Sequence, residues 1–459
     1  MTSHETPRER ATDDAVEPSI GQLEPHNLLA LSAYSVLLRF AWIFKTESVI
    51  IPAFLDSIAG AGWLRGCLPV LNRFGQSLPP MLFARRLRRA RRKKWSLLGT
   101  AVGLGIPLLV LAALWLMLDN KQQRWLPAVF LFLYLVFFIS SGLNQLSFGT
   151  LQGKLIRPDR RGELLGMSGL VGSVASVIGA WFLLQRWLSL PDHGFGWIFG
   201  FSGFGFLLAG ATCFFIREPA DVGQVSNLPR HENPSGDGQV ENLPHEEGGI
   251  RASWRLVCRD ARFRWLAVVA MLFIAIQLLF PHFQALGQKH VSAEQLGFQL
   301  MLWVIAQNVA VGVFSFISGK IADRLGNRLS LQWQVFGTAL VPLLALLFTS
   351  GIAGFETKHF WLTFFFLGLT PVTIKTLTNY ALELAEADQH PLYVSTLHAC
   401  LAVPFFFSPL VGWLVDLLGF ESVFLGVSGV IFLGGLASFR LIEPRQQQRD
   451  KFVELQPEP

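Results

Sequence analysis

The chain has 459 residues, of which 51% are hydrophobic and only 15% are charged, whereas soluble domains usually carry about 25% charged residues. Too few polar groups remain to cover a water-exposed surface, so this composition favours a membrane protein, for which lipid is the solvent. The formal net charge is +6. The basic residues flank apolar segments, a placement that the positive-inside rule explains better than nucleic-acid binding does.

Residues 1–26 are polar and contain no short apolar core before a cleavage site, so they are not a signal peptide. We expect them to form a disordered cytoplasmic tail. A spanning helix needs about 20 mainly apolar residues. Twelve segments meet this requirement: 29–52, 62–83, 96–118, 125–148, 164–187, 195–216, 264–287, 296–318, 329–350, 359–382, 393–416 and 420–441. The sequence therefore predicts an all-α polytopic membrane protein with twelve transmembrane helices.

The connections between these segments differ in charge on their two sides. The stretches 84–94, 153–163, 251–264 and 319–328 are basic, whereas 119–124 and 191–193 are short and nearly neutral. The connection 383–390 is acidic, but acidic residues count little in the positive-inside rule. We therefore expect an integral protein of the cell (inner) membrane with both termini in the cytoplasm.

A polar stretch separates the sixth and seventh segments. GQVSNLP at 223–229 recurs there as GQVENLP at 238–244, and such polar sequence cannot bury enough apolar surface to fold alone. We interpret it as a spacer, with partner docking as the alternative. The sixth segment runs into FFIREP and the twelfth into FRLIEP. These matching ends indicate a duplicated unit, with a first six-helix bundle at 27–216, a cytoplasmic linker at 217–262, a second six-helix bundle at 263–444 and a cytoplasmic tail at 445–459.

The loop GKIADRLGNR at 319–328 resembles the signature loop G-x-x-x-D-R-x-G-R-R of the major facilitator superfamily, from which only Asn327 departs. Arg160-Arg161-Gly162 is a second match, and Gly412-Trp-Leu-Val-Asp416-Leu-Leu-Gly419 is a weaker third. The resemblance implies two six-helix bundles (the MFS fold) and transport by alternating access. The implied gating motif comprises Gly319, Asp323, Arg324, Gly326 and Arg328.

In this motif Gly319 would allow close helix approach, and Asp323 and Arg324 would pair across the cytoplasmic ends of the halves. Gly326 would permit the tight turn. The equivalent loop of the first half, PMLFARRL at 80–87, lacks the Gly and Asp. Segment 169–179 has the spacing of small-residue helix packing instead of the Gly-Pro element typical of the family's drug/proton antiporters. This departure favours solute uptake over drug export.

Charged side chains inside a membrane are costly and point to function by default. Segment 29–52 holds three: Arg39, Lys45 and Glu47. In a continuous helix Arg39 and Glu47 lie about 80° apart around the axis, and Lys45 points away from both. We expect Arg39 and Glu47 to share a cavity-facing sector, with a structural salt bridge to a neighbouring helix as the alternative.

Further polar residues are candidates for substrate binding or coupling. Lys375 and Asn379 lie on one face of segment 359–382, below Pro371. The remaining candidates are Asn144, Gln145, Gln277, His282, Gln307, Asn308 and His398. Capping, packing and interhelical hydrogen bonds are the alternative roles. The resemblance implies that the first, fourth, seventh and tenth helices line the central cavity, and all four carry such residues.

The basic groups Arg39, Lys45 and Lys375 outnumber one deep acid, Glu47. This balance suits an anionic solute, since arginine can hold a carboxylate or phosphate with two hydrogen bonds. We predict a secondary active transporter of a small polar or anionic solute. Proton coupling through Glu47 or His398 is one expectation, and cation coupling or uncoupled facilitation stay open. The alternatives are a drug/proton efflux antiporter and a non-transporting membrane sensor on the same scaffold.

The sequence carries no signature of an intramembrane enzyme or of a nucleotide-binding loop, so we expect neither catalysis nor primary pumping. The four cysteines, Cys67, Cys213, Cys258 and Cys400, are scattered without ligand spacing. We therefore expect no cofactor and no metal, and we expect a monomer whose partners are the solute, the lipid bilayer and protons.

Overall fold

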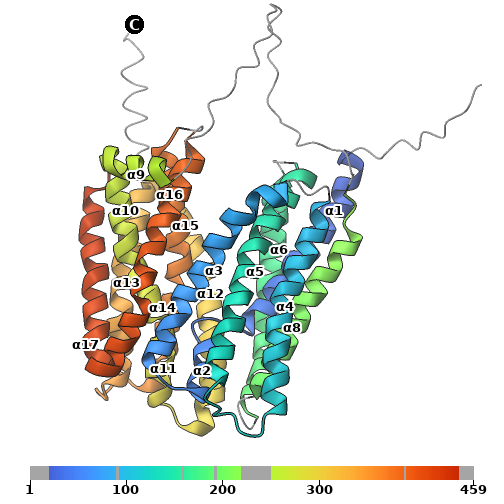
Figure 1. The fold of residues 1–459 in the computed structure, drawn as a ribbon. Coiled ribbons are helices and arrows are strands. Elements are labelled where there is room, and N and C mark those ends of the chain that lie inside the picture. Colours follow the sequence, from blue (N-terminus) through green and yellow to red (C-terminus); the bar gives the residue numbers. More distant parts are fainter. Residues whose placement is uncertain are drawn as a thin grey trace, which may run out of the picture.

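In this computed structural model the described residues are 20–88, 92–157, 160–190, 194–218, 250–386 and 389–443, and all of their regular secondary structure is helical. The first bundle contains α1 (Ile20–Ile43), α2 (Ile50–Ile58), α3 (Gly62–Arg88), α4 (Lys93–Met117), α5 (Leu126–Leu155), α6 (Arg161–Gly179), η2 (Ala180–Leu184), α7 (Gln185–Leu188), α8 (Phe195–Ala211) and η4 (Thr212–Phe215). The second contains α9 (Ile250–Arg259), α10 (Ala261–Phe273), η5 (Ile274–Leu279), α11 (Phe280–Lys289), α12 (Ala293–Leu325), α13 (Asn327–Thr349), η6 (Thr357–His359), α14 (Trp361–Leu367), α15 (Leu369–Leu384), α16 (His390–Ala402), η7 (Val403–Phe407), α17 (Ser408–Ala437) and η8 (Ser438–Arg440). The two bundles stand next to each other (Figure 1).

Among the described residues, nine helical runs are long and apolar enough to cross a membrane. The last, His390–Arg440, contains two crossings, because Gly419 interrupts the helix with a φ of +82°. Two more crossings complete the twelve: α1 with α2, and α3, which is less apolar because it carries several polar side chains. The predicted fold of twelve transmembrane helices in two six-helix bundles is confirmed.

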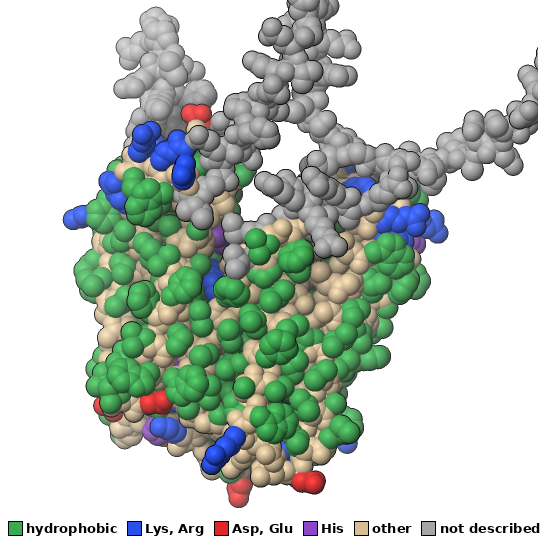
Figure 2. All heavy atoms as spheres, viewed as in Figure 1, with side chains coloured by type: hydrophobic (Ala, Val, Ile, Leu, Met, Phe, Trp, Pro, Cys, Tyr) green, Lys and Arg blue, Asp and Glu red, His purple; other side chains and the backbone are tan. Residues whose placement is uncertain are grey.

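The described chain begins with α1 and ends after η8 at the same end of the molecule, the upper end in Figure 1. We call this end the terminal face and the other end the opposite face. On the face shown in Figure 2, hydrophobic side chains cover both bundles, and charged side chains lie mostly near the two ends. Phe182 and Phe406 are 69% and 72% exposed, an exposure that lipid accommodates and water does not.

The first transmembrane segment differs from the predicted continuous helix over 29–52. It begins at Ile20, inside the predicted tail, and residues 44–49 are not helical. In the predicted linker, residues 250–259 form α9. The repeats at 223–229 and 238–244 lie outside the described residues, as do residues 1–19 of the first predicted tail and the whole of the second, 445–459.

Each bundle ends by folding back over the start of its own third transmembrane helix. Glu218 accepts hydrogen bonds from the N–H groups of Lys93 and Lys94, at the start of α4, at 3.0 and 2.9 Å. In the second bundle Glu443 accepts one from the N–H of Arg328, at the start of α13, at 3.1 Å. A helix start has unpaired N–H groups and a partial positive charge, which a carboxylate stabilises. The repeated ends FFIREP and FRLIEP therefore place a capping glutamate in both halves.

The two bundles approach each other most closely near the opposite face. There α3 packs on α17, α2 on α11, and α12 on η2 and α7. A Cβ atom on Gly412 would overlap the carbonyl oxygen of Gly62, so this approach requires glycine. The N–H of Gly62 also donates to both carboxylate oxygens of Asp416, at 3.0 and 2.7 Å. These contacts join α3 to α17 and draw the bundles together at the opposite face.

Candidate functional site

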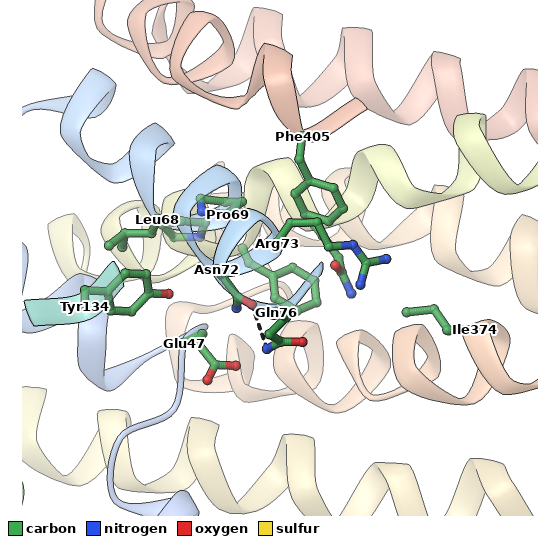
Figure 3. A pocket seen from close by; sticks show the side chains of 12 residues that line it. Glu47, Leu68, Pro69, Asn72, Arg73, Gln76, Tyr134, Ile374 and Phe405 are labelled. Atoms are coloured by element: carbon green, nitrogen blue, oxygen red, sulfur yellow. Dashed lines mark hydrogen bonds between the residues drawn. The ribbon is translucent and has the colours of Figure 1, made fainter. Parts of the chain in front are cut away.

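A cavity of about 240 Å³ lies between the two bundles. The first bundle contributes the non-helical residues after α1, together with α3 and α5, and the second contributes η5, α11, α15 and η7. The lining residues are Glu47, Leu68, Pro69, Asn72, Arg73, Gln76, Tyr134, Gln277, Phe280, Pro281, Ile374 and Phe405. Most of the polar lining comes from the first bundle, and the second presents mainly apolar side chains (Figure 3).

Arg73, on α3, is the basic side chain that lines this cavity. Its Nε and Nη2 atoms are buried and make no hydrogen bond to any described residue. The guanidinium carbon lies 5.2 Å from the ring centroid of Phe405, which belongs to the other bundle (Figure 3). A buried N–H group without a partner is unfavourable, so a hydrogen-bond acceptor that enters the cavity would stabilise this site.

Two amide side chains lie beside Arg73 on α3. The Nε2 of Gln76 donates to the Oδ1 of Asn72 at 2.8 Å. Asn72, Arg73 and Gln76 were not among the residues predicted from sequence, although a deep arginine in an apolar segment is itself a functional signal. Asn72 and Gln76 are one helical turn apart, and this spacing could have identified the polar face of the helix.

Lys45 and Glu47 form an ion pair within the break between α1 and α2. Lys45 is fully buried, and its ammonium lies 3.3 Å from the ring centroid of Trp42, with Phe137 and Phe138 at 4.4 and 4.9 Å. Glu47 keeps 30% of its side chain exposed and lines the cavity. The predicted geometry, with Lys45 directed away from Glu47, is wrong because the chain does not continue as a helix through residues 44–49.

Arg39 lies apart from Glu47. Its Nη1 donates to the carbonyl oxygen of Gly169 and to the hydroxyl of Ser173, both on α6, at 2.8 and 2.9 Å. The expected sector shared with Glu47 is therefore not formed. Arg39 contacts a neighbouring helix of its own bundle through uncharged acceptors, and the salt bridge that was the alternative is not formed among the described residues either.

Two of the other predicted residues lie between the bundles, and three are exposed. Gln277 lines the cavity, and the side chain of Gln307 accepts a hydrogen bond from Ser48 of the other bundle. Lys375 and Asn379 are exposed on α15, following Ile374, which lines the cavity. His398 is exposed on α16. Gln277 and Gln307 therefore bring polar groups of the second bundle next to the first.

Some predicted residues are buried and do not line the cavity. Asn144 is buried, and its amide donates to the hydroxyls of Tyr34 and Thr100. His282 is fully buried, and neither of its ring nitrogens has a partner among the described residues. Two others are exposed: Gln145, and Asn308, whose amide donates to its own helix at the carbonyl of Val304 at 2.8 Å.

The signature segment 319–328 comprises the end of α12, the turn at Gly326 and the start of α13 at the terminal face. Gly326 has a φ of +91°, as the tight turn requires, and its backbone lies against the Glu443 carboxylate. A Cβ atom on Gly319 would meet no atom within 4 Å, so the close helix approach expected there is absent from this conformation. Asp323 and Arg324 are exposed, and the expected ion pair across the two halves is not formed among the described residues.

The sequence matches a family model described as Major Facilitator Superfamily over residues 41–355 and 283–459. The chain belongs to the major facilitator superfamily. No functionally curated protein matches it significantly in sequence. Among solved structures, the nucleoside transporter NupG is similar with a TM-score of 0.67 and 12% identity, over 90% of this chain and 99% of that one.

Two further transporter structures have a similar fold. A D-xylose-proton symporter gives a TM-score of 0.64 at 13% identity, over 91% of this chain and 98% of that one. A peptide transporter POT in complex with sulfate gives 0.66 at 13% identity, over 92% and 98%. At these identities the likeness establishes the major facilitator fold, and the family makes the chain an integral membrane protein.

Proposed function

We propose that this chain is a secondary transporter that moves a small polar or anionic solute across a lipid bilayer by alternating access. The observation that carries the proposal is the cavity between the bundles, because side chains of both bundles line it and the bundles meet at the opposite face. A site with walls on two separately movable bundles can be exposed to one side of a membrane at a time.

The polar lining supports a small hydrophilic solute. Asn72, Gln76 and Gln277 offer amide donors and acceptors, and Arg73 and Glu47 add charges of both signs. A lipid-soluble substrate would leave these groups without partners, and unpaired polar groups lower affinity. The lining therefore favours a solute with hydrogen-bonding groups over an apolar drug.

The terminal face is the cytoplasmic side in this proposal. Described residues near that face include Lys93, Lys154, Arg157 and Arg217, and such residues accumulate on the cytoplasmic side of membrane proteins. Since the bundles are joined at the opposite face, this structure corresponds to the state closed to the outside. The protein would then reside in the cell membrane with both termini in the cytoplasm.

A proton gradient is the driving force that we propose, with Glu47 as the titrating group. Its carboxylate faces the cavity, and its ion pair with Lys45 would break when the carboxylate takes up a proton. His398 is the second candidate, since it is exposed on α16.

Flux into proteoliposomes, measured for labelled solutes with and without an imposed pH gradient, tests this proposal. We expect accumulation only when the gradient is present. Glu47→Gln should abolish gradient-driven accumulation, a loss of tenfold or more, and leave exchange of the solute at equal pH. Gradient-driven uptake that Glu47→Gln leaves intact would exclude Glu47 as the coupling group.

A further inference from the structure

We propose that Arg73 makes this cavity a binding site for a carboxylate, so that the transported solute is a small hydroxylated monocarboxylate. This inference rests on the proposed transport function and narrows its substrate class. The two unpaired nitrogens of Arg73, Nε and Nη2, lie on the same edge of the guanidinium group. Two parallel N–H groups on one edge match the two oxygens of a carboxylate, a pairing that gives both strength and orientation.

The positive charge of Arg73 is not neutralised by any acidic residue that lines the cavity. Glu47, the acidic residue of the lining, already pairs with Lys45. Among the described residues, Arg73 has neither an ion pair nor a hydrogen bond at Nε or Nη2. One uncompensated positive charge balances a monoanion, whereas a phosphate monoester carries close to two negative charges at neutral pH. The charge balance therefore favours a monocarboxylate over a phosphorylated solute.

Phe405 fixes the position of the guanidinium group. Its ring centroid lies 5.2 Å from the guanidinium carbon and comes from η7 of the second bundle. Arginine groups are attracted to aromatic rings at this distance. The contact spans the two bundles, so a carboxylate bound to Arg73 would sit where the bundles move relative to each other.

The rest of the cavity fits the hydroxylated part of such a solute. The amides of Asn72, Gln76 and Gln277 can each donate and accept, and the Glu47 carboxylate can accept from a hydroxyl group. The volume of about 240 Å³ is at or below the low end of ordinary small-molecule sites. The cavity therefore suits a compact solute better than a peptide or a lipid.

Matched pairs of probes separate the carboxylate from the rest of the molecule. D-gluconate is compared with D-sorbitol, and D-glycerate with glycerol, because each pair differs only in its carboxylate. Binding is measured by thermal shift on the purified full chain, and exchange is measured in proteoliposomes. We expect at least one carboxylate to bind at least tenfold more tightly than its uncharged counterpart, and we expect glycerol 3-phosphate to bind more weakly than glycerate.

Substitutions at Arg73 test the role of the guanidinium edge. Arg73→Gln should lower carboxylate affinity tenfold or more and change polyol affinity far less. Arg73→Lys should retain part of the affinity, since lysine keeps the positive charge but lacks the two parallel N–H groups of the guanidinium edge. Arg124→Gln removes an equal charge from an exposed turn and should change neither affinity.

Four results would overturn the carboxylate site: carboxylates that bind no better than their polyols, an equal loss of both affinities in Arg73→Gln, full retention of affinity in Arg73→Lys and Arg73→Gln alike, or a preference for the phosphate. Exchange of polyols alone would overturn this inference and leave the transport proposal standing. Arg73-dependent carboxylate binding without any exchange would support the site and contradict transport.

Discussion

The ammonium of Lys45 is buried between aromatic rings in the middle of a membrane protein. It contacts the face of Trp42 and pairs with Glu47. An ammonium group loses its hydration when buried, and that loss is tolerable only with a charged partner and polarisable neighbours. The same pair removes one negative charge from the cavity, so Lys45 shapes the site from a position that no solute reaches.

Removing Lys45 should therefore destabilise the protein. Lys45→Met leaves the Glu47 carboxylate without its cation. Loss of one partner of a fully buried pair costs about 3–5 kcal/mol, and we expect about 2 kcal/mol here, because 30% of the Glu47 side chain is open to the cavity. The thermal unfolding midpoint in detergent measures the effect.

Two further variants control for this result. Lys45→Met combined with Glu47→Gln removes both charges and should recover most of the midpoint. Lys358→Met breaks an ion pair with Glu356 in which the side chains are 63% and 60% exposed, and such pairs contribute little. A Lys45→Met midpoint equal to that of the wild type would contradict this prediction. It would show that the ion pair with Glu47 adds no net stability.

At the scale of single residues, sequence identified Glu47 and Gln277, both of which line the cavity. The sequence-based prediction that the Lys45 side chain points away from Glu47 is wrong, because the 100° rotation per residue holds only within a continuous helix. Sequence also missed Arg73, whose importance depends on Phe405, more than three hundred residues later in the chain. Contacts between distant segments are set by tertiary packing, which local pattern does not contain.

At the scale of elements, the capping glutamates show what a repeated sequence can and cannot predict. FFIREP and FRLIEP indicate two related halves. The role of the shared glutamate becomes visible only when each end is folded over the start of a third transmembrane helix, α4 or α13. Element existence was predictable from apolar length, since all twelve segments are present. The break in the first segment was not, because residues 44–49 have no proline or glycine to mark it.

Glu218 should be the more important of the two caps. Its side chain is completely buried and accepts from Lys93, Lys94 and the ammonium of Lys154. Loss of a helix cap alone costs about 0.5–2 kcal/mol, and Glu218→Ala also leaves Lys154 without this partner. We expect Glu218→Ala to lower unfolding stability by about 2–3 kcal/mol, at or above the upper end of the cap range.

The matched comparison is Glu443→Ala, measured by the same thermal unfolding assay. Glu443 caps one N–H, that of Arg328, and we expect a loss of about 1 kcal/mol. Glu218→Gln should lie between wild type and Glu218→Ala, since the amide oxygen still accepts from the helix. A larger loss for Glu443→Ala than for Glu218→Ala would contradict this ranking.

At the scale of the whole molecule, the two bundles are held together by close backbone contact on one side of the cavity. Gly62 and Gly66 of α3 face Gly412 and Ser408 of α17, with no space for a Cβ atom at any of the glycines. Asp416 adds hydrogen bonds to the N–H of Gly62 and lies 4.0 Å from Arg65. The segment 412–419, which is the weaker third match to the family signature, thus forms the contact at the opposite face. It lies away from the signature loop at the terminal face.

A large side chain at Gly412 should prevent this contact and open the cavity toward the opposite face. In a background without cysteine, Gln277→Cys places a single thiol in the cavity lining, and a membrane-impermeant maleimide applied to either side of sealed vesicles reports which face gives access. For Gly412→Trp we expect labelling from the opposite face to rise several-fold and labelling from the terminal face to fall.

Gly429→Trp is the matched control, since Gly429 lies in the second half of α17 with nothing within 4 Å of a Cβ atom. It should label as the parent does. Net solute flux should fall in Gly412→Trp and persist in Gly429→Trp, because alternating access requires that both faces can close. If Gly412→Trp folds and its labelling still matches that of the parent, the α3–α17 contact does not control access, and the outer closure must depend on α2 with α11 or on α12 with α7.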